Sequence, residues 1–214
     1  MNDLLTSNKR TLCAIFITMK IIVASNNEHK IAEYRELFSS LSIQIVSMSE
    51  ANIKCEVEET GDSYEKNAAL KAEAIKDQTK QLVIADDSGL EIEALDDFPG
   101  LYSARFALEQ GGSEKANSKV LDLLQNETNR KARFVATIAL CNLKAETLVF
   151  RGECQGLISQ ESIGRGGFGY DPIFFSLEAN ASFSTLTSEE KNRFSHRGKA
   201  VASLIAYLKS ENVI

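Results

Sequence analysis

The pattern of apolar positions predicts alternating strands and helices in the first part of the chain. Residues 21–24 and 43–48 are predicted to be buried strands, because they are short, apolar and rich in β-branched side chains. Between them, apolar residues recur at helical spacing from Glu28 to Leu41. A second helix is predicted from Asp62 to Asp77, and Glu65 lies at the capping-box distance from its first residue.

A polar segment joins the first strand to the first helix. Ser25, Asn26 and Asn27 follow the strand, and asparagine is a favoured N-cap residue. The helix N-terminus carries free N–H groups and a positive dipole end, and Lys30 lies one turn further on. This arrangement predicts an anion site, although an ordinary capped helix with a surface lysine is the alternative.

The apolar run from Leu82 to Ala85 leads directly into Asp86, Asp87, Ser88 and Gly89. We expect a buried strand that ends at the two carboxylates. Adjacent acids repel each other and lose hydration, so a positive group is expected against them, and a hard divalent cation is the simplest candidate. The alternative is a solvated Asp-Asp-Ser-Gly turn.

The middle of the chain predicts a long hairpin. Residues 90–95 continue with alternation after the acidic pair, and a helix is predicted from Ser113 to Glu127. Two extended stretches, 133–143 and 147–158, are joined by three residues and are therefore predicted to pair as antiparallel strands. Strands of this length are suited to a sheet shared by two lobes.

A glycine-rich segment at 164–169 matches G-x-G-x-x-G but is not a dinucleotide fingerprint. That fingerprint requires a helix immediately afterwards, whereas residues 170–175 contain a proline and a strand-like run. The segment is instead predicted to be a loop that presents Phe168, Tyr170 and Asp171. The sequence contains no P-loop motif either.

The C-terminal part predicts two helices. A capping box at Thr187 precedes a short helix that carries Lys191, and residues 195–198 then interrupt the pattern. A helix is predicted from Lys199 to Lys209. Considered alone, His196 is interpreted as a capping or packing histidine.

Composition excludes some classes of protein. The chain has 214 residues and a net charge of −6, which argues against a sequence-independent nucleic-acid binder, since such a protein needs a basic face. None of its four cysteines has metal-finger spacing, and we expect a reduced cytoplasmic protein. Residues 1–18 imitate a signal peptide, but the apolar run is short, so we expect an extension before a folded part that starts near Met19. No run approaches the length of a transmembrane helix, and no membrane partner is expected.

Six motifs in chain order carry a resemblance to a known family. They are Ser25-Asn26-Asn27-x-x-Lys30, Glu58-Glu59-Thr60-Gly61, Ala85-Asp86-Asp87-Ser88-Gly89-Leu90, Pro99-Gly100-x-Tyr102-Ser103-Ala104-Arg105, Gly166-Gly167-Phe168-Gly169-Tyr170-Asp171-Pro172 and Ser195-His196-Arg197-Gly198. From about Met19 to the C-terminal helix, the chain resembles the inosine triphosphate pyrophosphatase family, also called Ham1-like or RdgB-like. The departures are the N-terminal extension and Ser25-Asn26, where many members have Thr-Gly.

The resemblance implies a mixed α/β fold, with an elongated central sheet and helices, in which residues 19–214 form one domain of two lobes flanking a substrate cleft. It also implies a homodimer and a Mg²⁺-dependent enzyme that hydrolyses ITP, dITP and XTP to the monophosphate and pyrophosphate, which cleanses the nucleotide pool.

The resemblance also implies roles for individual residues. Asp87 would be the general base and a metal ligand, with Glu58 as a further ligand and Glu59 a less favoured one. The substrate would be bound by Ser25, Asn26, Asn27, Lys30, Lys71, Ser88, Phe168, Gly169, Tyr170, Asp171, Lys191, His196 and Arg197.

Two alternatives remain from the sequence. One is a Maf-type pyrophosphatase that acts on pyrimidine or modified nucleotides. The other is a nucleotide-binding regulator without turnover, which the retained Asp87, Glu58 and Lys30 disfavour, because a pure binder needs no base beside a metal.

Overall fold

The computed structural model describes residues 19–164 and 166–214, so the predicted extension at residues 1–18 lies outside the described part. One eight-stranded mixed sheet, in the order β2-β1-β3-β5-β6-β7-β8, forms the centre, and β4 pairs with β3 beside this path. The strands are β1 (Met19–Val23), β2 (Ile43–Ser47), β3 (Leu82–Ile92), β4 (Phe98–Pro99), β5 (Lys131–Cys141), β6 (Leu148–Ile158), β7 (Phe174–Ser176) and β8 (Ala181–Ser182).

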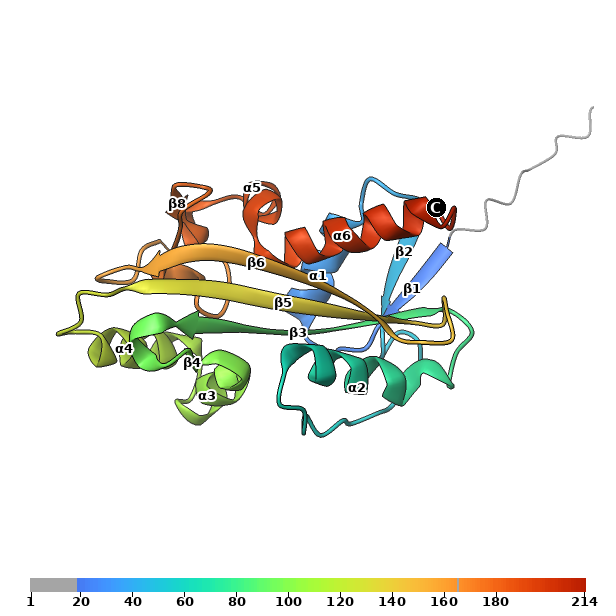
Figure 1. Ribbon diagram of the computed structural model, residues 1–214, viewed down its shortest axis with the longest axis horizontal. Coiled ribbons are helices and arrows are strands. Elements are labelled where there is room, and N and C mark those ends of the chain that lie inside the picture. Colours follow the sequence, from blue (N-terminus) through green and yellow to red (C-terminus); the bar gives the residue numbers. More distant parts are fainter. Residues whose placement is uncertain (1–18, 165) are drawn as a thin grey trace, which may run out of the picture.

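Strand length gives the sheet its elongated form. The strands β3, β5 and β6 have 11 residues each and pair antiparallel, whereas β1 pairs parallel with both β2 and β3. These three strands run along most of the molecule (Figure 1). The mixed α/β fold with an elongated central sheet is therefore confirmed, as is the β5–β6 hairpin. The division into two lobes stays a prediction.

Helices cover both faces of the sheet. They are α1 (Glu28–Leu37), α2 (Tyr64–Lys76), α3 (Ser103–Glu109), α4 (Ser113–Leu123), α5 (Ser188–Phe194) and α6 (His196–Ser210), with short 3-10 turns at Glu93–Leu95, Gly100–Tyr102, Asp171–Ile173 and Phe183–Thr185. In Figure 1, α5 and α6 lie on one side of the long strands, and α2, α3 and α4 lie on the other. Among the described helices, none combines the length and the apolar character needed to cross a membrane.

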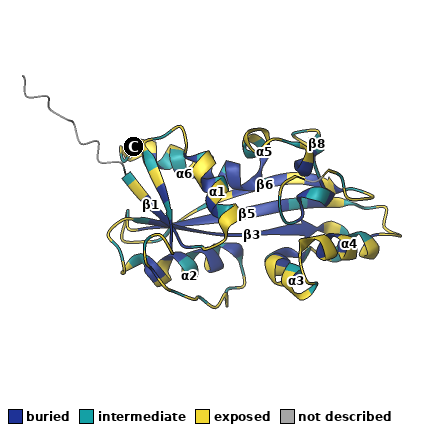
Figure 2. Cartoon of the chain, turned by 180° about the vertical axis from the view of Figure 1, so that it is seen from behind, coloured by how far each residue is buried: buried dark blue, intermediate teal, exposed yellow. Residues whose placement is uncertain are grey.

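The period-two alternation of the strands distributes their side chains between these layers. Ile21 and Ile84 pack with α1 and α6 in one buried cluster, whereas Ile22 and Val83 pack with α2 in another. A third cluster at the far end joins α3 and α4 to β7. Figure 2 shows β3 and β5 buried along most of their length, with exposed positions on the outer sides of the helices.

The predicted strand end at the acidic pair is wrong, because β3 continues to Ile92. Its register with β5 places Asp86 opposite Ile138 and Asp87 opposite Thr137, so both acids lie inside a ladder of backbone hydrogen bonds. The alternative of a solvated turn is also wrong, since Asp86 and Asp87 are only 3% and 6% exposed. Pairing with a long partner strand outweighs the low strand propensity of aspartate.

Some helix boundaries also differ from the predictions. The N-cap of α2 is Ser63, whose side chain accepts a hydrogen bond from the Lys66 N–H, so the predicted capping box at Asp62 is wrong. The predicted interruption between the two C-terminal helices is confirmed at Ser195, which ends α5 and caps α6 by accepting from the Gly198 N–H. Its predicted extension over residues 196–198 is wrong, because α6 begins at His196. The helix α3 was not predicted. In addition, α1 and α4 end about one turn earlier than expected.

Candidate active site

The site lies along an unpaired edge of β3. On this edge, β1 pairs with β3 between Leu82 and Ile84, and β4 pairs with it at Glu91 and Ile92. In the described part of the chain, no strand pairs with the edge between these two stretches. A cavity of about 290 Å³ lies there, with residues 87–90 on its wall. The early end of β1 therefore leaves a strand edge open to a ligand.

Most of the predicted site residues line this cavity: Asn27, Lys30, Asp87, Ser88, Phe168, Gly169, Tyr170, Asp171, Lys191, His196 and Arg197. The cavity lining does not include Ser25, Asn26, Glu58 or Lys71. Of these, Lys71 still contacts the site through Asp87.

The loop after β1 is built as the sequence predicts. The Asn27 side chain caps α1 by accepting from the Lys30 N–H at 3.2 Å, and the Asn27 N–H donates to Ser25 Oγ at 3.1 Å. Because Asn27 and Lys30 also line the cavity, the N-terminus of α1 and an ammonium group both lie at one end of it. Both features favour an anion.

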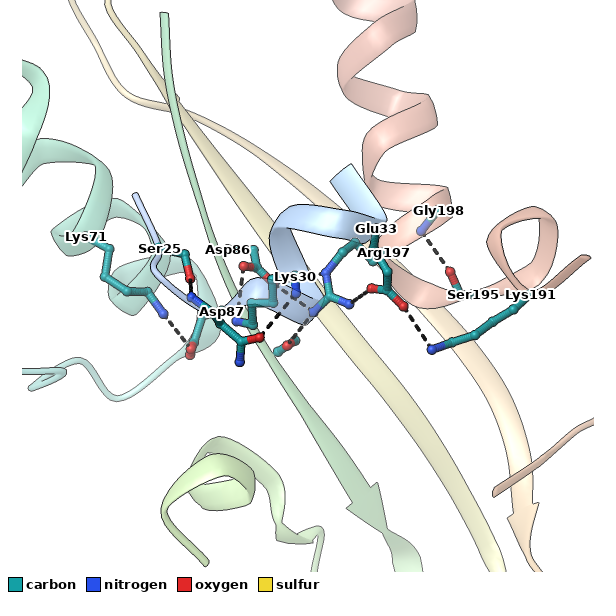
Figure 3. Close-up of polar contacts among 12 residues, drawn as sticks. Ser25, Lys30, Glu33, Lys71, Asp86, Asp87, Lys191, Ser195, Arg197 and Gly198 are labelled. Atoms are coloured by element: carbon teal, nitrogen blue, oxygen red, sulfur yellow. Dashed lines mark hydrogen bonds and ion pairs between the residues drawn. The ribbon is translucent and has the colours of Figure 1, made fainter. Parts of the chain in front are cut away.

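Asp86 is held by cations of the protein itself. Its carboxylate lies 3.1 Å from Lys30 Nζ and accepts from Arg197 Nη2 at 3.0 Å and Nε at 3.2 Å (Figure 3). Burial alone would raise the pKa of Asp86, but the charges of Lys30 and Arg197 outweigh burial and hold the pKa well below its usual range. The positive group expected against this acid is thus a pair of side chains, not a metal.

Asp87 lies on the opposite face of β3, in a different environment. Its oxygens accept from Lys71 Nζ at 2.9 Å and from Asn67 Nδ2 at 3.3 Å. Burial raises the pKa of Asp87, because it outweighs the opposing charge of Lys71. Two neighbouring carboxylates with pKa values shifted in opposite directions are a common feature of acid–base sites, and here Asp87 is the better proton acceptor.

The donor set around Asp87 fits a hard divalent cation. Lys71 Nζ lies 2.9 Å from an oxygen of Glu59 and 2.9 Å from an oxygen of Asp87, so two carboxylates converge on one positive group. Oxygen ligands of this kind suit Mg²⁺, which keeps several waters and takes few protein ligands. Glu59 lines the cavity and Glu58 does not, so the geometry favours Glu59, the less favoured ligand from the sequence. Among the described residues, no cluster of three or more His, Cys, Asp or Glu side chains is suited to a metal.

Glu33 pairs with both Lys191 and Arg197 and was missed from the sequence. It accepts from Lys191 Nζ at 2.9 Å and also from Arg197 Nη1 (Figure 3). The Arg197 and Lys191 charges overcome the effect of burial and lower the pKa of Glu33. The sequence feature that could have indicated a place for Glu33 in the site is its spacing of three residues from Lys30, which puts both residues on the same side of α1.

The glycine loop presents an aromatic ring and a buried acid. The Phe168 N–H donates to Asp171 Oδ2 at 2.8 Å, and Lys191 Nζ donates to the same oxygen at 2.7 Å. Burial raises the pKa of Asp171 despite the charge of Lys191. Lys191 Nζ also lies 4.8 Å from the centre of the Phe168 ring. A ring beside hydrogen-bonding groups is suited to a planar heterocycle.

Asn117 and Ser103, which were not predicted as site residues, fasten this loop. Asn117 Nδ2 donates to the Gly169 carbonyl at 3.1 Å, and Tyr170 Oη donates to the Ser103 carbonyl at 2.8 Å. The Ser103 hydroxyl in turn accepts from the Leu90 N–H of β3 at 2.9 Å. The only sequence signal for Asn117 was a polar residue beside the apolar face of its helix.

His196 is a buried side chain in the wall of the cavity. Its ring stacks on Phe134, with the ring centres 4.7 Å apart, and its Nδ1 is buried with no hydrogen-bond partner among the described residues. Burial and the nearby Arg197 charge hold the pKa of His196 far below its ordinary value. Arg197 also donates to Ser88 Oγ at 3.2 Å. The position of His196 is therefore compatible both with the predicted packing role and with a place in the pocket.

The cavity combines a cationic end, an aromatic end and a carboxylate with raised proton affinity. This combination defines the class of protein as one built to bind a nucleoside phosphate and to activate water beside it. The chain belongs to the Ham1 family, whose model matches residues 21–207. The family resemblance drawn from the six motifs is therefore confirmed.

Individual relatives agree with this assignment. The chain is 43% identical over 198 residues to a protein of Clostridium perfringens named dITP/XTP pyrophosphatase. The aligned region covers 89% of this chain and 97% of that protein. The chain is similar to the solved structure of the Staphylococcus aureus Ham1 protein, with a TM-score of 0.79 and 41% identity over 90% of this chain and 99% of that one. A nucleoside-triphosphatase / dITP/XTP pyrophosphatase from Mycobacterium abscessus gives a TM-score of 0.69 and 38% identity over 87% and 98%.

Proposed function

We propose that the protein hydrolyses dITP, ITP and XTP to the nucleoside monophosphate and pyrophosphate, and so cleanses the nucleotide pool. The observation that carries the proposal is that Asp87, the cationic end and the Phe168 loop all face one cavity. The relatives named dITP/XTP pyrophosphatase support the same substrates and disfavour a Maf-type specificity.

The phosphates bind at the cationic end. Asn27 and the N-terminus of α1 supply N–H donors, and Lys30 and Lys71 supply charge. Both lysines are paired with Asp86 or Asp87 before substrate enters, so they are already held in place and lose little side-chain freedom on binding.

The base binds at the aromatic end. Phe168 stacks on the purine, and Asp171 accepts from ring N–H groups. Arg197, His196 or a backbone N–H satisfies O6 of a 6-oxo purine. The 6-amino group of adenine would instead face a donor and leave both groups unpaired, which disfavours ATP.

Asp87 holds and accepts the proton of the attacking water, since its raised pKa makes it the better base of the two neighbouring acids. We propose that Asp87 and the Glu58-Glu59 segment hold Mg²⁺ beside the phosphates. When bound, the metal would supply positive charge that stabilises the departing pyrophosphate. Lys30 and Lys71 provide charge for the same purpose from the protein.

A nucleotide panel assayed with Mg²⁺ tests the proposal. Release of pyrophosphate from ITP, dITP and XTP, in preference to ATP and GTP, is the expected result. Orthophosphate as the first product would refute it, and a preference for dTTP or UTP would indicate the Maf-type alternative. Nucleotide binding without any turnover would indicate a regulator.

We also propose a cytoplasmic homodimer, on the basis of the family resemblance. Light scattering coupled to size exclusion tests the dimer, because a monomer mass at micromolar concentration would contradict it.

A further inference from the structure

One of the two histidines of the chain has no role in the site described above. His29 is an exposed residue in the first turn of α1, beside the loop that caps this helix. Its ring lies parallel to that of Phe168, with an angle of 5° between the planes and 5.4 Å between the ring centres. Offset parallel rings at this separation attract each other beyond the burial of their surface.

Phe168 separates two cavities. Phe168 is part of the wall of the active-site cavity and also of a second cavity of about 240 Å³. His29 lines the second cavity and not the first. The imidazole therefore lies on the outer side of Phe168. Two cations that line the first cavity also lie against the ring, with Lys191 Nζ 4.8 Å and Arg197 Cζ 5.8 Å from its centre.

The backbone on both sides of Phe168 is glycine, so the position of the ring depends on what the ring itself contacts. Gly167 and Gly169, its two neighbours, both have positive φ angles of 72° and 63°. The hydrogen bonds that fasten the loop hold the Phe168 N–H, the Gly169 carbonyl and the Tyr170 hydroxyl, and none of them holds the ring itself. A flexible ring would have to be ordered when a base stacks on it, which would weaken binding.

From these observations we propose that His29 is a positioning residue for the base. It stacks on the outer face of Phe168 and fixes the ring so that the inner face receives the heterocycle of the substrate. The contact also joins the phosphate-binding end of the site, on α1, to the base-binding loop. This inference rests on the proposed function and names the determinant of base affinity within that site.

The test compares His29→Ala and His29→Tyr with the unmodified protein. His29→Ala should raise the KM for ITP by about 2- to 10-fold, as expected for the loss of one aromatic pair, with kcat unchanged. His29→Tyr restores a ring at the same place and should restore the KM. Glu36→Gln is the matched control, since Glu36 lines the same outer cavity and, among the described residues, no hydrogen bond, ion pair or aromatic contact joins it to Phe168. This control should leave both constants unchanged.

Two further measurements separate the ring contact from other effects. Inhibition by pyrophosphate should be the same in His29→Ala and the unmodified protein, because pyrophosphate carries no base. In a Phe168→Ala background, His29→Ala should have no additional effect on the KM, since coupled residues are not additive. An unchanged KM in His29→Ala, a parallel loss of pyrophosphate inhibition, or a full effect without Phe168 would each overturn the inference.

The proposed function and this inference fail in different ways. If the unmodified protein does not hydrolyse ITP, the proposed function is refuted, and the same variants are then compared for ITP binding by calorimetry. If it is active and His29→Ala binds ITP normally, only the role of His29 is refuted.

Discussion

The adjacent acids of β3 allow one matched experiment, because Asp86→Asn and Asp87→Asn remove the same charge from opposite faces of one strand. Asp86 is paired with Lys30 and Arg197, and its environment favours the charged form. Asp87 lies at the cavity wall, and burial disfavours its charged form. We therefore expect Asp86→Asn to lower stability and Asp87→Asn to lower turnover.

The expected loss for Asp86→Asn follows from its burial. Its side chain is 0% exposed and that of Arg197 is 2% exposed, so solvent does not screen the pair. Removing one partner of a buried ion pair lowers the free energy of unfolding by about 3–5 kcal/mol. We expect the lower value, about 3 kcal/mol, because Arg197 retains its ion pair with Glu33 in the variant. At about 2–4 °C per kcal/mol for a protein of this size, the melting temperature should fall by about 6–12 °C.

The pH dependence has a definite sign. The pKa of Asp86 is lower in the folded protein than in the unfolded chain, where aspartate titrates near about 3.9. The stabilisation is therefore fully present above that pH and is lost as the pH falls through the folded-state pKa. The difference in melting temperature between the unmodified protein and Asp86→Asn should be full at pH 7 and should shrink below about pH 4.

Asp87→Asn should instead lower ITP turnover and leave the melting temperature unchanged or higher. Turnover of ITP should fall by about 10² to 10⁴ through loss of the base, with a further loss if the metal is held there. The melting temperature at pH 7 should hold or rise, because burial of the charged carboxylate no longer opposes folding and Lys71 keeps Glu59.

The assay is a set of melting curves from pH 3 to 8, together with ITP turnover for both variants. Normal turnover in Asp87→Asn would refute its role as the base. An unchanged melting temperature in Asp86→Asn would refute the argument that the buried ion pairs stabilise the fold.

Other predictions are simpler. Asn117→Ala should raise the KM for ITP several-fold while kcat and pyrophosphate inhibition stay the same, because the Gly169 carbonyl loses its donor; equal changes in both inhibition and KM would contradict this. Glu33→Gln should lower both the melting temperature and the affinity for ITP, since two cations lose one partner; a thermal shift assay and the KM measure the two effects. Chelation with EDTA should abolish turnover and added Mg²⁺ should restore it, whereas full activity in EDTA would exclude a metal requirement. Truncation to Met19 should leave ITP turnover and solubility intact, because the family match begins after this residue.

The sequence by itself determined the local elements and the motifs. Alternating and helical spacings located most strands and helices, and the order of six short motifs was enough to recognise the family. Local capping was also predictable where a single side chain decides it, as at Asn27 and Thr187. These features depend on residues close together in the chain, so local sequence contains the information.

The roles of the two acids depended on tertiary structure. From the sequence, Asp86 and Asp87 were an exposed or metal-bound pair at a strand end. Pairing with β5 continues the strand, and the pleat then turns the two side chains to opposite faces. Each acid consequently meets different cations from distant parts of the chain, which separates their pKa values.

The same reason explains the residues that the sequence did not reveal. Glu33, Asn117 and His29 are ordinary helix residues in their own segments. Each acquires a role through a partner more than fifty positions away: Arg197, Gly169 and Phe168 respectively. The sequence therefore determined which segments carry the chemistry. Tertiary packing decided which charges are paired, which of the two carboxylates has the raised pKa and which side chain lies against the Phe168 ring, because these depend on distances between segments that no local pattern encodes.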